Sequence, residues 1–362
     1  MSNPKDYTVG WICAVLKEYT AAQLFLDNEH EPPAGISVND TNHYTLGEVA
    51  GHKVAIAVLP DGEYGVGSAA SVVTNLLNSF PNIRVGLMVG IGGGAPTSKN
   101  DIRLGDVVVS SPTNGTGGVY QYDLGKTIQD VGFVQTGILD QPSATVRSAL
   151  PGLRRRYDIK GHQIKETIDS VLERWPRLRK KGFARPSPES DRLFASHIVH
   201  PTNGEGDCVD VCLTQQSSIV VRQPREDDDD DPAIHYGLIA SGNQLMKDAV
   251  VRDRLAKEKD ILCFEMEAAG IMNRFPCMVI RGICDYSDSH KNKDWQGYGA
   301  LTAAAYAKDL LKERSYHTVW RLRRGLRRVL VNVSIITIHT VTMLWLISTR
   351  LTAPSVGRGT CH

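Results

Sequence analysis

The sequence predicts an α/β fold, in which helices cover a mostly parallel or mixed β-sheet. Strand and helix patterns alternate over residues 1–125, stop in a segment rich in proline and charge, and resume at Ile234. The 362 residues, 41% of them apolar, can bury a large core. A net charge of +1 carries no electrostatic signature of nucleic-acid binding, so we expect a small-molecule ligand and no nucleic acid.

The first half supplies most of the predicted strands. Short apolar runs bounded by turn residues indicate strands, and small apolar residues at helical spacing indicate helices. Pro81 ends the second helix. In chain order we expect a strand at 7–13, a helix at 18–26, strands at 44–49 and 53–59, a helix at 68–78, and strands at 85–89 and 106–110.

Residues 141–232 are interpreted as an insertion, because proline and charge rise there and apolar periodicity weakens. The segment ends in the acidic run 226–231, which predicts a solvated, flexible loop. We expect one sheet to use both halves of a single domain, 6–313. After the insertion the predicted elements are a strand at 234–241, a helix at 246–257, a strand at 261–264, a helix at 267–273, a strand at 277–284 and a helix at 298–313.

The C-terminal tail, 314–362, is basic and then apolar. Arginines at 321–328 precede the segment 329–349, which has no Asp, Glu, Lys or Arg. That length can cross a membrane, with the arginines on the cytoplasmic side, although several polar residues dilute it. A membrane anchor, a non-spanning tail and an artefact of gene prediction are the alternatives. Seven cysteines, an odd number, and the lack of a secretory signal favour a reducing, cytoplasmic compartment.

A glycine-rich segment follows the strand expected at 85–89. Residues 90–95 match the pattern Gly-x-Gly-x-x-Ala of dinucleotide-binding loops. The context argues against that function, because Pro96 and a polar stretch lead to another strand where a helix is required. We therefore expect a glycine turn whose bare amides approach an anion, a water or a sugar, or a tight turn with no ligand.

Two acids follow other predicted strands. Glu267 follows the strand ending near Phe264, and Asp285 follows the strand ending at Cys284. In a mostly parallel sheet the carboxyl ends of strands meet at one edge, so these acids and Gly90 are expected to converge on one crevice. Taken singly, Glu267 is equally a helix N-terminal acid and Asp285 a turn residue.

Six motifs in this order resemble the nucleoside phosphorylase superfamily, and most of all its fungal branch. They are Gly10–Ala14, Gly65–Ala70, Val89–Gly94, Gly105–Val109, Phe264–Ala269 and Ile283–Asp285. The resemblance covers about 6–140 and 234–311. It implies a three-layer α/β/α sandwich with a central mixed sheet, cleavage of the N-glycosidic bond of purine nucleosides or nucleotides, no metal or redox cofactor, and a homo-oligomer.

The same resemblance assigns roles to single residues. Asp285 would be the general acid that protonates the purine at N7, and Glu18 the base that deprotonates water. Glu267 would accept two ribose hydroxyls and favour positive charge on the sugar, with Met266 beneath the ring. Glu265 would be a bystander, since two residues along a helix it would point to a different face. Further substrate contacts are expected from Gly90, Ile91, Gly92, Ser241 and Asn243.

Three questions stay open from the sequence. Phosphorolytic members of the family carry an arginine where this chain has Met88, and Arg84 fits poorly, so hydrolysis is favoured over phosphorolysis with inorganic phosphate as co-substrate. A nucleoside-sensing signalling module with little turnover is the alternative function. In the insertion, His197, His200, Cys208 and Cys212 are a loosely spaced zinc candidate, against free thiols and histidines in a loop.

Overall fold

The computed structural model describes residues 1–313 except 114, 202–211, 213–217, 227 and 292. The chain divides into two units, Met1–Glu313 and Arg314–His362. The second unit, which includes the candidate membrane segment 329–349, lies outside the described residues. Among the residues that are described, no helix is both long and apolar enough to cross a membrane.

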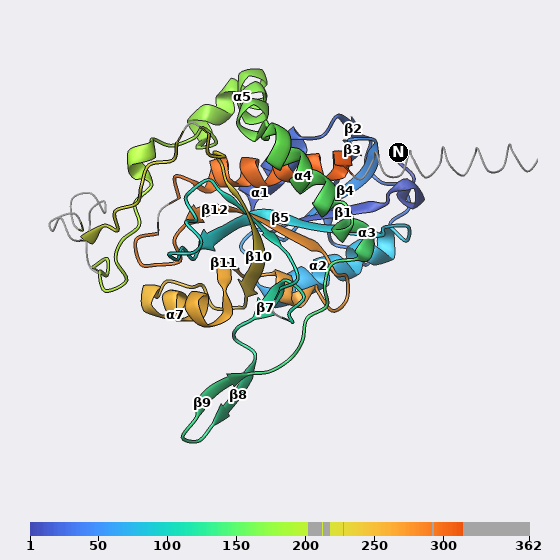
Figure 1. The fold of residues 1–362 in the computed structure, drawn as a ribbon. Coiled ribbons are helices and arrows are strands. Elements are labelled where there is room, and N and C mark those ends of the chain that lie inside the picture. Colours follow the sequence, from blue (N-terminus) through green and yellow to red (C-terminus); the bar gives the residue numbers. More distant parts are fainter. Residues whose placement is uncertain (114, 202–211, 213–217, 227, 292, 314–362) are drawn as a thin grey trace, which may run out of the picture. The chain divides into compact units, whose positions relative to one another are not determined.

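A large mixed sheet forms the centre of the first unit (Figure 1). Its strand order is β11-β10-β6-β12-β5-β1-β4-β3-β2, with β7 paired to β10. The central pairs β1–β4, β1–β5 and β5–β12 are parallel, whereas β2–β3, β3–β4 and β6–β12 are antiparallel. The strands are β1 (Val9–Cys13), β2 (Asn28–His30), β3 (His43–Val49), β4 (His52–Val58), β5 (Val85–Gly94), β6 (Val107–Ser110), β7 (Val119–Gln121), β10 (Ile234–Ser241), β11 (Ile261–Glu265) and β12 (Met278–Asp285).

The sheet curls so that β11 also pairs with β5. This contact is antiparallel and joins Cys263 to Gly94 and Phe264 to Gly93. It brings the carboxyl ends of β5, β11 and β12 together, which is the edge where the sequence predicted a site.

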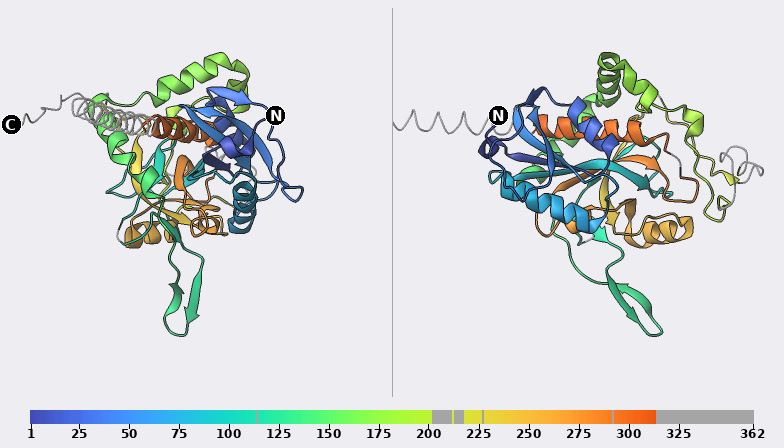
Figure 2. Two further views of the ribbon diagram at one scale, coloured as in Figure 1. Left: turned by 90° about the vertical axis from the view of Figure 1, so that its right-hand side faces the viewer. Right: turned by 180° about the vertical axis from the view of Figure 1, so that it is seen from behind.

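Helices cover both faces of the sheet (Figures 1 and 2). The helices α1 (Leu16–Leu24) and 296–313 lie on one side of the central strands, and α2 (Val66–Ser79) and α7 (Ala249–Lys259) on the other. Side chains from both halves of the chain, such as Trp11, Leu87 and Tyr306, are completely buried between the layers. The predicted three-layer α/β/α fold with a central mixed sheet is confirmed.

Two local expectations near the site are wrong. Residues 90–94 form no turn but extend β5, because the glycines at 90 and 92–94 leave room for the side chains and backbone of neighbouring segments. The helix expected at 267–273 is a single 3-10 turn, η5 (Ala268–Gly270), followed by turns.

The described residues of 141–232 form more regular structure than the composition of the segment suggested. These described residues include the helices α3 (Ala144–Arg147), α4 (Leu150–Lys160) and α5 (Ile164–Arg174) and the 3-10 turns η2 (Pro176–Lys181) and η3 (Pro188–Ser190). The 3-10 turn η1 (Pro4–Asp6) lies near the N-terminus. The apolar stripe of α5, Ile164, Ile168 and Leu172, is buried in the main core. These residues are four apart, as expected for one face of a helix, but the charged residues between them weaken the apolar periodicity of the sequence.

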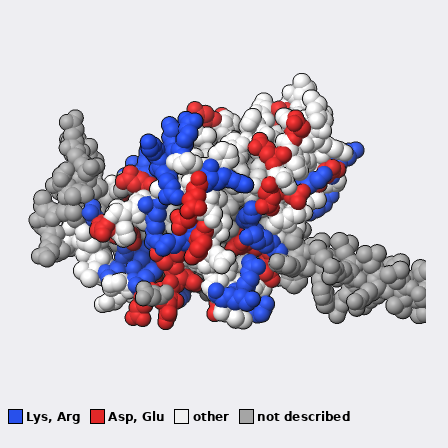
Figure 3. Space-filling model, turned by 90° about the horizontal axis from the view of Figure 1, so that it is seen from above, with Lys and Arg blue, Asp and Glu red and all other residues white. Residues whose placement is uncertain are grey.

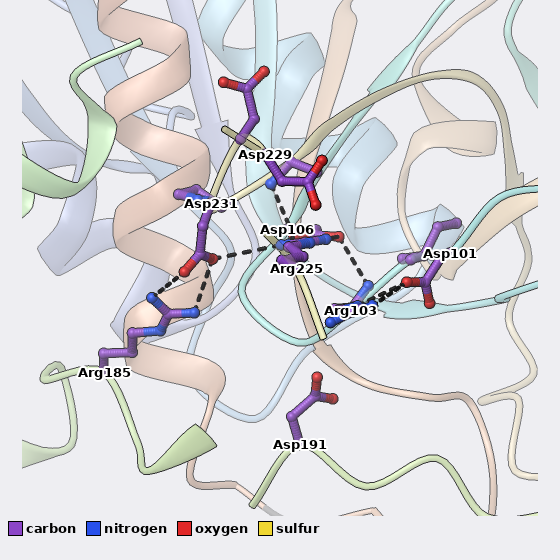
Figure 4. Close-up of polar contacts among 12 residues, drawn as sticks. Asp101, Arg103, Asp106, Arg185, Asp191, Arg225, Asp229 and Asp231 are labelled. Carbon is purple, nitrogen blue, oxygen red and sulfur yellow. Dashed lines mark hydrogen bonds and ion pairs between the residues drawn. The ribbon is translucent and has the colours of Figure 1, made fainter. Parts of the chain in front are cut away.

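Ion pairs fasten the end of this segment to the sheet (Figure 4). Asp106, completely buried before β6, accepts from both Nη atoms of Arg225, at 2.8 and 2.6 Å. Arg185 makes a two-pronged pair with Asp231 at 2.6 and 2.8 Å, so the last residue of the acidic run is held in place. Burial alone would raise the pKa of Asp106, but His235 and Arg225 outweigh it and lower that pKa.

Two further features complete the described surface. The hairpin of β8 (Gly125–Ile128) and β9 (Gly132–Gln135) projects from the domain (Figures 1 and 2). On the face seen from above, acidic and basic side chains are intermixed (Figure 3).

Candidate active site

One guanidinium joins three carboxylates inside the domain. Arg281 lies on β12 and is completely buried. Its Nη2 donates to Glu265 Oε2 and lies 3.6 Å from Glu267 Oε2, and its Nη1 lies 3.7 Å from Glu18 Oε1. Burial acts to lower the pKa of Arg281, but the three carboxylates outweigh burial and raise it. Three buried acids therefore share one cation, which leaves excess negative charge at this point.

Glu18 links the first helix to the glycine segment. It is the third residue of α1, and its Oε2 accepts from the amides of Ala14 and Val15 at 2.6 and 3.2 Å. Its Oε1 accepts from the amide of Ile91 at 2.8 Å. Burial raises the pKa of Glu18, and Arg281 and these amides offset the rise only in part. The residue thus caps its helix and also reaches β5.

The glycines make room for these groups. A Cβ added to Gly90 would overlap the Glu18 carboxylate and come within 2.6 Å of Arg281 Nη1. A Cβ on Gly92 would lie 3.2 Å from Arg281 Cβ, and one on Gly93 would lie 2.6 Å from Asp285 Oδ1. The glycine segment is therefore the common neighbour of Glu18, Arg281 and Asp285.

Glu267 lies against the beginning of α2. The amide of Gly65, whose φ of 93° suits glycine, donates to Glu267 Oε1 at 3.4 Å. Burial raises the pKa of Glu267 to about 7, the charges of Glu265 and Glu18 add to the rise, and Arg281 and the Gly65 amide oppose it. A carboxyl with this pKa changes its charge near neutral pH, which is typical of functional sites.

Glu265 organises the turn that carries Glu267 and Met266. It is the last residue of β11, and its carboxylate accepts from the amides of Glu267 and Ala268 at 3.1–3.2 Å in addition to Arg281. The helix-face reason for treating Glu265 as a bystander is therefore wrong, because the residue ends a strand. Met266 is partly exposed, whereas its two glutamate neighbours are buried.

The predicted base-contacting residues flank the same turn. Ser241 Oγ accepts from the amide of Ala269 at 2.8 Å. Asn243 is exposed, and its Oδ1 accepts from the amide of Val66 at 3.1 Å, next to the amide that reaches Glu267. Asp123, which the sequence did not single out, accepts from the amide of Asn243 at 2.6 Å.

Asp285 has its own set of contacts. Its Oδ1 accepts from the amide of Ser287 at 2.9 Å, and its Oδ2 lies 3.0 Å from Lys291 Nζ and 3.4 Å from Cys284 Sγ. Burial has the largest effect on the Cys284 thiol and raises its pKa, and the negative charges of Asp285 and Glu18 raise this pKa further. Both carboxylates therefore act on the same side chain. The structure thus brings Glu18, Glu267, the glycine segment and Asp285 to one edge of the sheet, although their roles stay predictions.

Sequence reasoning missed the basic partners of this site. Arg281 stands in the apolar run Met278–Asp285, and a lone arginine in a buried strand was the available signal. Lys291 gave no comparable signal, because it lies in a polar loop.

Two cavities, about 180 Å³ at the base of the β8–β9 hairpin and about 500 Å³ beside Arg225, lie away from the carboxylates. We place the site at the carboxylates because their charge and burial require compensation or use.

No metal centre is found in the part of the chain that the structure describes, where no group of three His, Cys, Asp or Glu side chains is arranged to hold an ion. In the predicted zinc set, His200 Nδ1 lies 3.2 Å from Cys212 Sγ. Cys208 lies outside the described residues.

Solved nucleosidase structures share this architecture. Futalosine hydrolase of Helicobacter pylori superposes with a TM-score of 0.51 and 17% identity, covering 85% of this chain and 98% of that one. A 5'-methylthioadenosine/S-adenosylhomocysteine nucleosidase from Neisseria meningitidis, in complex with methylthio-immucillin-A, gives 0.52 and 15%, covering 84% and 98%. The chain is therefore an α/β domain of the nucleoside phosphorylase-like fold.

The chain also has relatives at the level of sequence, although no family model matches it. A nucleotide-binding leucine-rich repeat (NLR)-like protein of the fungus Hyaloscypha variabilis is 45% identical over 309 residues, 85% of this chain and 29% of that protein. ATP nucleosidase Cap17 of Escherichia coli is 32% identical over 80 residues, 20% of this chain and 16% of Cap17. The chain thus spans less than a third of the length of either relative. These findings confirm the resemblance to the nucleoside phosphorylase superfamily and its fungal branch.

Proposed function

We propose that this domain hydrolyses the N-glycosidic bond of purine nucleosides or nucleotides. The observation that carries the proposal is the buried group of Glu18, Glu265 and Glu267 around the single cation of Arg281. Cleavage of the bond develops positive charge on the sugar, and a fixed excess of negative charge stabilises such a transition state. The solved nucleosidases and Cap17 support the same reaction class.

Each acid has a distinct task in this mechanism. Glu267 would accept the ribose hydroxyls and favour the cationic sugar, with Met266 beneath the ring. Glu18, whose pKa burial raises, would take a proton from the attacking water, since a base works best when its pKa approaches the working pH. Asp285 would deliver a proton to the leaving base. The amides of Gly90, Ile91 and Gly92 and the residues Ser241 and Asn243 would position the substrate.

Hydrolysis is preferred to phosphorolysis because the described site offers no free arginine for a phosphate. Met88 is buried, and Arg84 is exposed and donates to the carbonyls of Pro81 and Ile83. Arg281 is already committed to three carboxylates. Inorganic phosphate would be a co-substrate only if the reaction were phosphorolytic, and no metal or redox cofactor is proposed.

A second candidate function is a nucleoside sensor with little turnover, which the NLR-like relative favours. A sensor has the same need for Glu267 and the base-contacting turn but none for a proton donor. A homo-oligomer, which the family resemblance implies, is compatible with either function.

The test is to incubate the 362-residue chain with adenosine, inosine, methylthioadenosine and ATP, with and without phosphate, and to separate the bases and sugars by chromatography. ATP is included because Cap17 is named for it. We expect free base and free sugar in both conditions, and Asp285→Asn to abolish base release while the far-ultraviolet circular dichroism stays unchanged. Sugar 1-phosphate would overturn hydrolysis, and tight binding without product would favour the sensor.

A further inference from the structure

The proposed acid is held in an ion pair. Asp285 has a side chain only 4% exposed, and its Oδ2 lies 3.0 Å from the ammonium of Lys291, which is 23% exposed. Among the described residues this is the one ion-pair partner that the structure gives Lys291. This pair is separate from the group in which Arg281 contacts Glu18, Glu265 and Glu267. Asp285 and that group of glutamates therefore each have their own cation.

Each polar contact that the described residues make with Asp285 offers it a hydrogen. The amide of Ser287 donates to Oδ1, and the thiol of Cys284 and the ammonium of Lys291 donate to Oδ2. A carboxyl group surrounded only by donors is satisfied as the ionised acceptor, which holds no proton of its own. A leaving purine nevertheless needs a proton at N7. The nearest source on the same oxygen is the Lys291 ammonium.

We propose that Lys291 is a positioning residue for the hydrolysis proposed above, acting through Asp285 as the source of the proton that reaches the purine. An N–H bond of the Lys291 ammonium breaks as Asp285 Oδ2 takes that proton, and Asp285 passes a proton to N7. The bond between C1′ and N9 breaks with its electron pair going to the base. Water bonds to C1′ and gives one proton to Glu18, which returns it through solvent to the neutral Lys291 amine. The products are free sugar and neutral base.

The loop that carries Lys291 is placed for this exchange. Lys17, on the helix of Glu18, donates from its Nζ to the carbonyl of Lys293 at 3.3 Å, which ties the loop to α1. Lys291 is partly exposed, so the ammonium can recover a proton from solvent. Because Asp285 is buried, removing the ammonium should lower the stability of the fold, so the circular dichroism and urea unfolding of each variant are compared with those of the wild type.

The test uses substrates that differ only at N7: adenosine, inosine, guanosine and ATP, each with its 7-methyl counterpart. A methylated base already carries the positive charge and leaves without a proton. We expect Lys291→Met to lower kcat for the unmethylated substrate by about 100-fold or more, as for loss of general acid catalysis. With the 7-methyl substrate the rate should stay close to that of the wild type. Lys291→Arg keeps a positive charge beside Asp285, but its guanidinium does not release a proton, so it should lose activity on the unmethylated substrate and keep it on the 7-methyl substrate.

The control is Lys293→Met, because Lys293 is exposed in the same loop and takes part only through its carbonyl. This variant should cleave both substrates at the wild-type rate. An equal loss on both substrates in Lys291→Met would mean a structural role, and no loss on either would remove Lys291 from the mechanism; both results overturn the inference while hydrolysis stands. A wild-type protein that releases no base from any substrate overturns the proposed function and this inference together.

Discussion

Glu267 should lower the stability of the folded protein at neutral pH, and replacing it should therefore stabilise the fold. Its pKa rises from an ordinary value of 4.5 to about 7, chiefly through burial and then through Glu265 and Glu18. At about 1.4 kcal/mol per pKa unit, that difference corresponds to about 3.5 kcal/mol. Glu267→Gln keeps an oxygen for the Gly65 amide and removes the charge, and the attraction of Arg281 at 3.6 Å is already contained in this pKa. We expect a gain of up to about 3.5 kcal/mol in free energy of unfolding above pH 7.

The sign of the pH dependence is fixed by which state holds the proton. Between pH 4.5 and 7 the folded protein keeps a proton on Glu267 that the unfolded chain has released. The stability of the wild type therefore falls as pH rises through this window, and above pH 7 the contribution of Glu267 no longer changes with pH. The advantage of Glu267→Gln should be smallest near pH 4.5 and largest above pH 7.

Urea unfolding at pH 5 and pH 8, followed by circular dichroism, measures this difference. Glu258→Gln is the matched control, because Glu258 is exposed on α7. Glu267→Gln should also lose base release, since an amide cannot accept two hydroxyls as a carboxylate does. The reasoning is refuted if the stability difference between variant and wild type is the same at both pH values.

Three other substitutions test the surroundings of the site. Arg281→Met should lower the free energy of unfolding by about 3–5 kcal/mol at pH 7.5 in urea titrations, because three buried carboxylates lose their cation. Arg281→Lys keeps a positive charge and should lower the free energy of unfolding less, and equal losses in the two variants would argue against charge as the cause. Gly90→Ala should reduce base release by about 100-fold, since its Cβ displaces the Glu18 carboxylate, and a wild-type kcat would show that Glu18 is not the base. Asp106→Asn should cost about 3 kcal/mol and should reduce the acid sensitivity of unfolding. The lowered pKa of Asp106 gives stability that is present above pH 3.8 and is lost as pH falls below it, so an unchanged profile between pH 2 and 5 would contradict the importance of its pair with Arg225.

The sheet and its edge were predictable because they depend on local patterns. Apolar runs set β1, β5 and β12, and the acids that follow two of the strands pointed to the carboxyl edge. The three partners of Arg281 were beyond such reasoning, since they come from α1, β11 and the turn after β11. The glycines at 90 and 92–94 predict a turn because glycine weakens strands locally, whereas in the fold packing against neighbouring groups requires glycine there. The helices of 141–232 escaped notice because exposed charges diluted the apolar stripe.

The pairing of β5 with β1, β12 and β11 limits how a substrate can enter. A strand bonded to three neighbours cannot swing aside without breaking several backbone ladders at once. The polar edge where the acids meet is consequently a rigid floor. Entry and release must then depend on the connections above that floor, chiefly 61–65, 242–248 and 286–291, which carry no regular helix or strand. Changes in those connections that keep Gly65, Ser287 and Lys291 should alter rates of binding and release, while the geometry of the carboxylates stays the same.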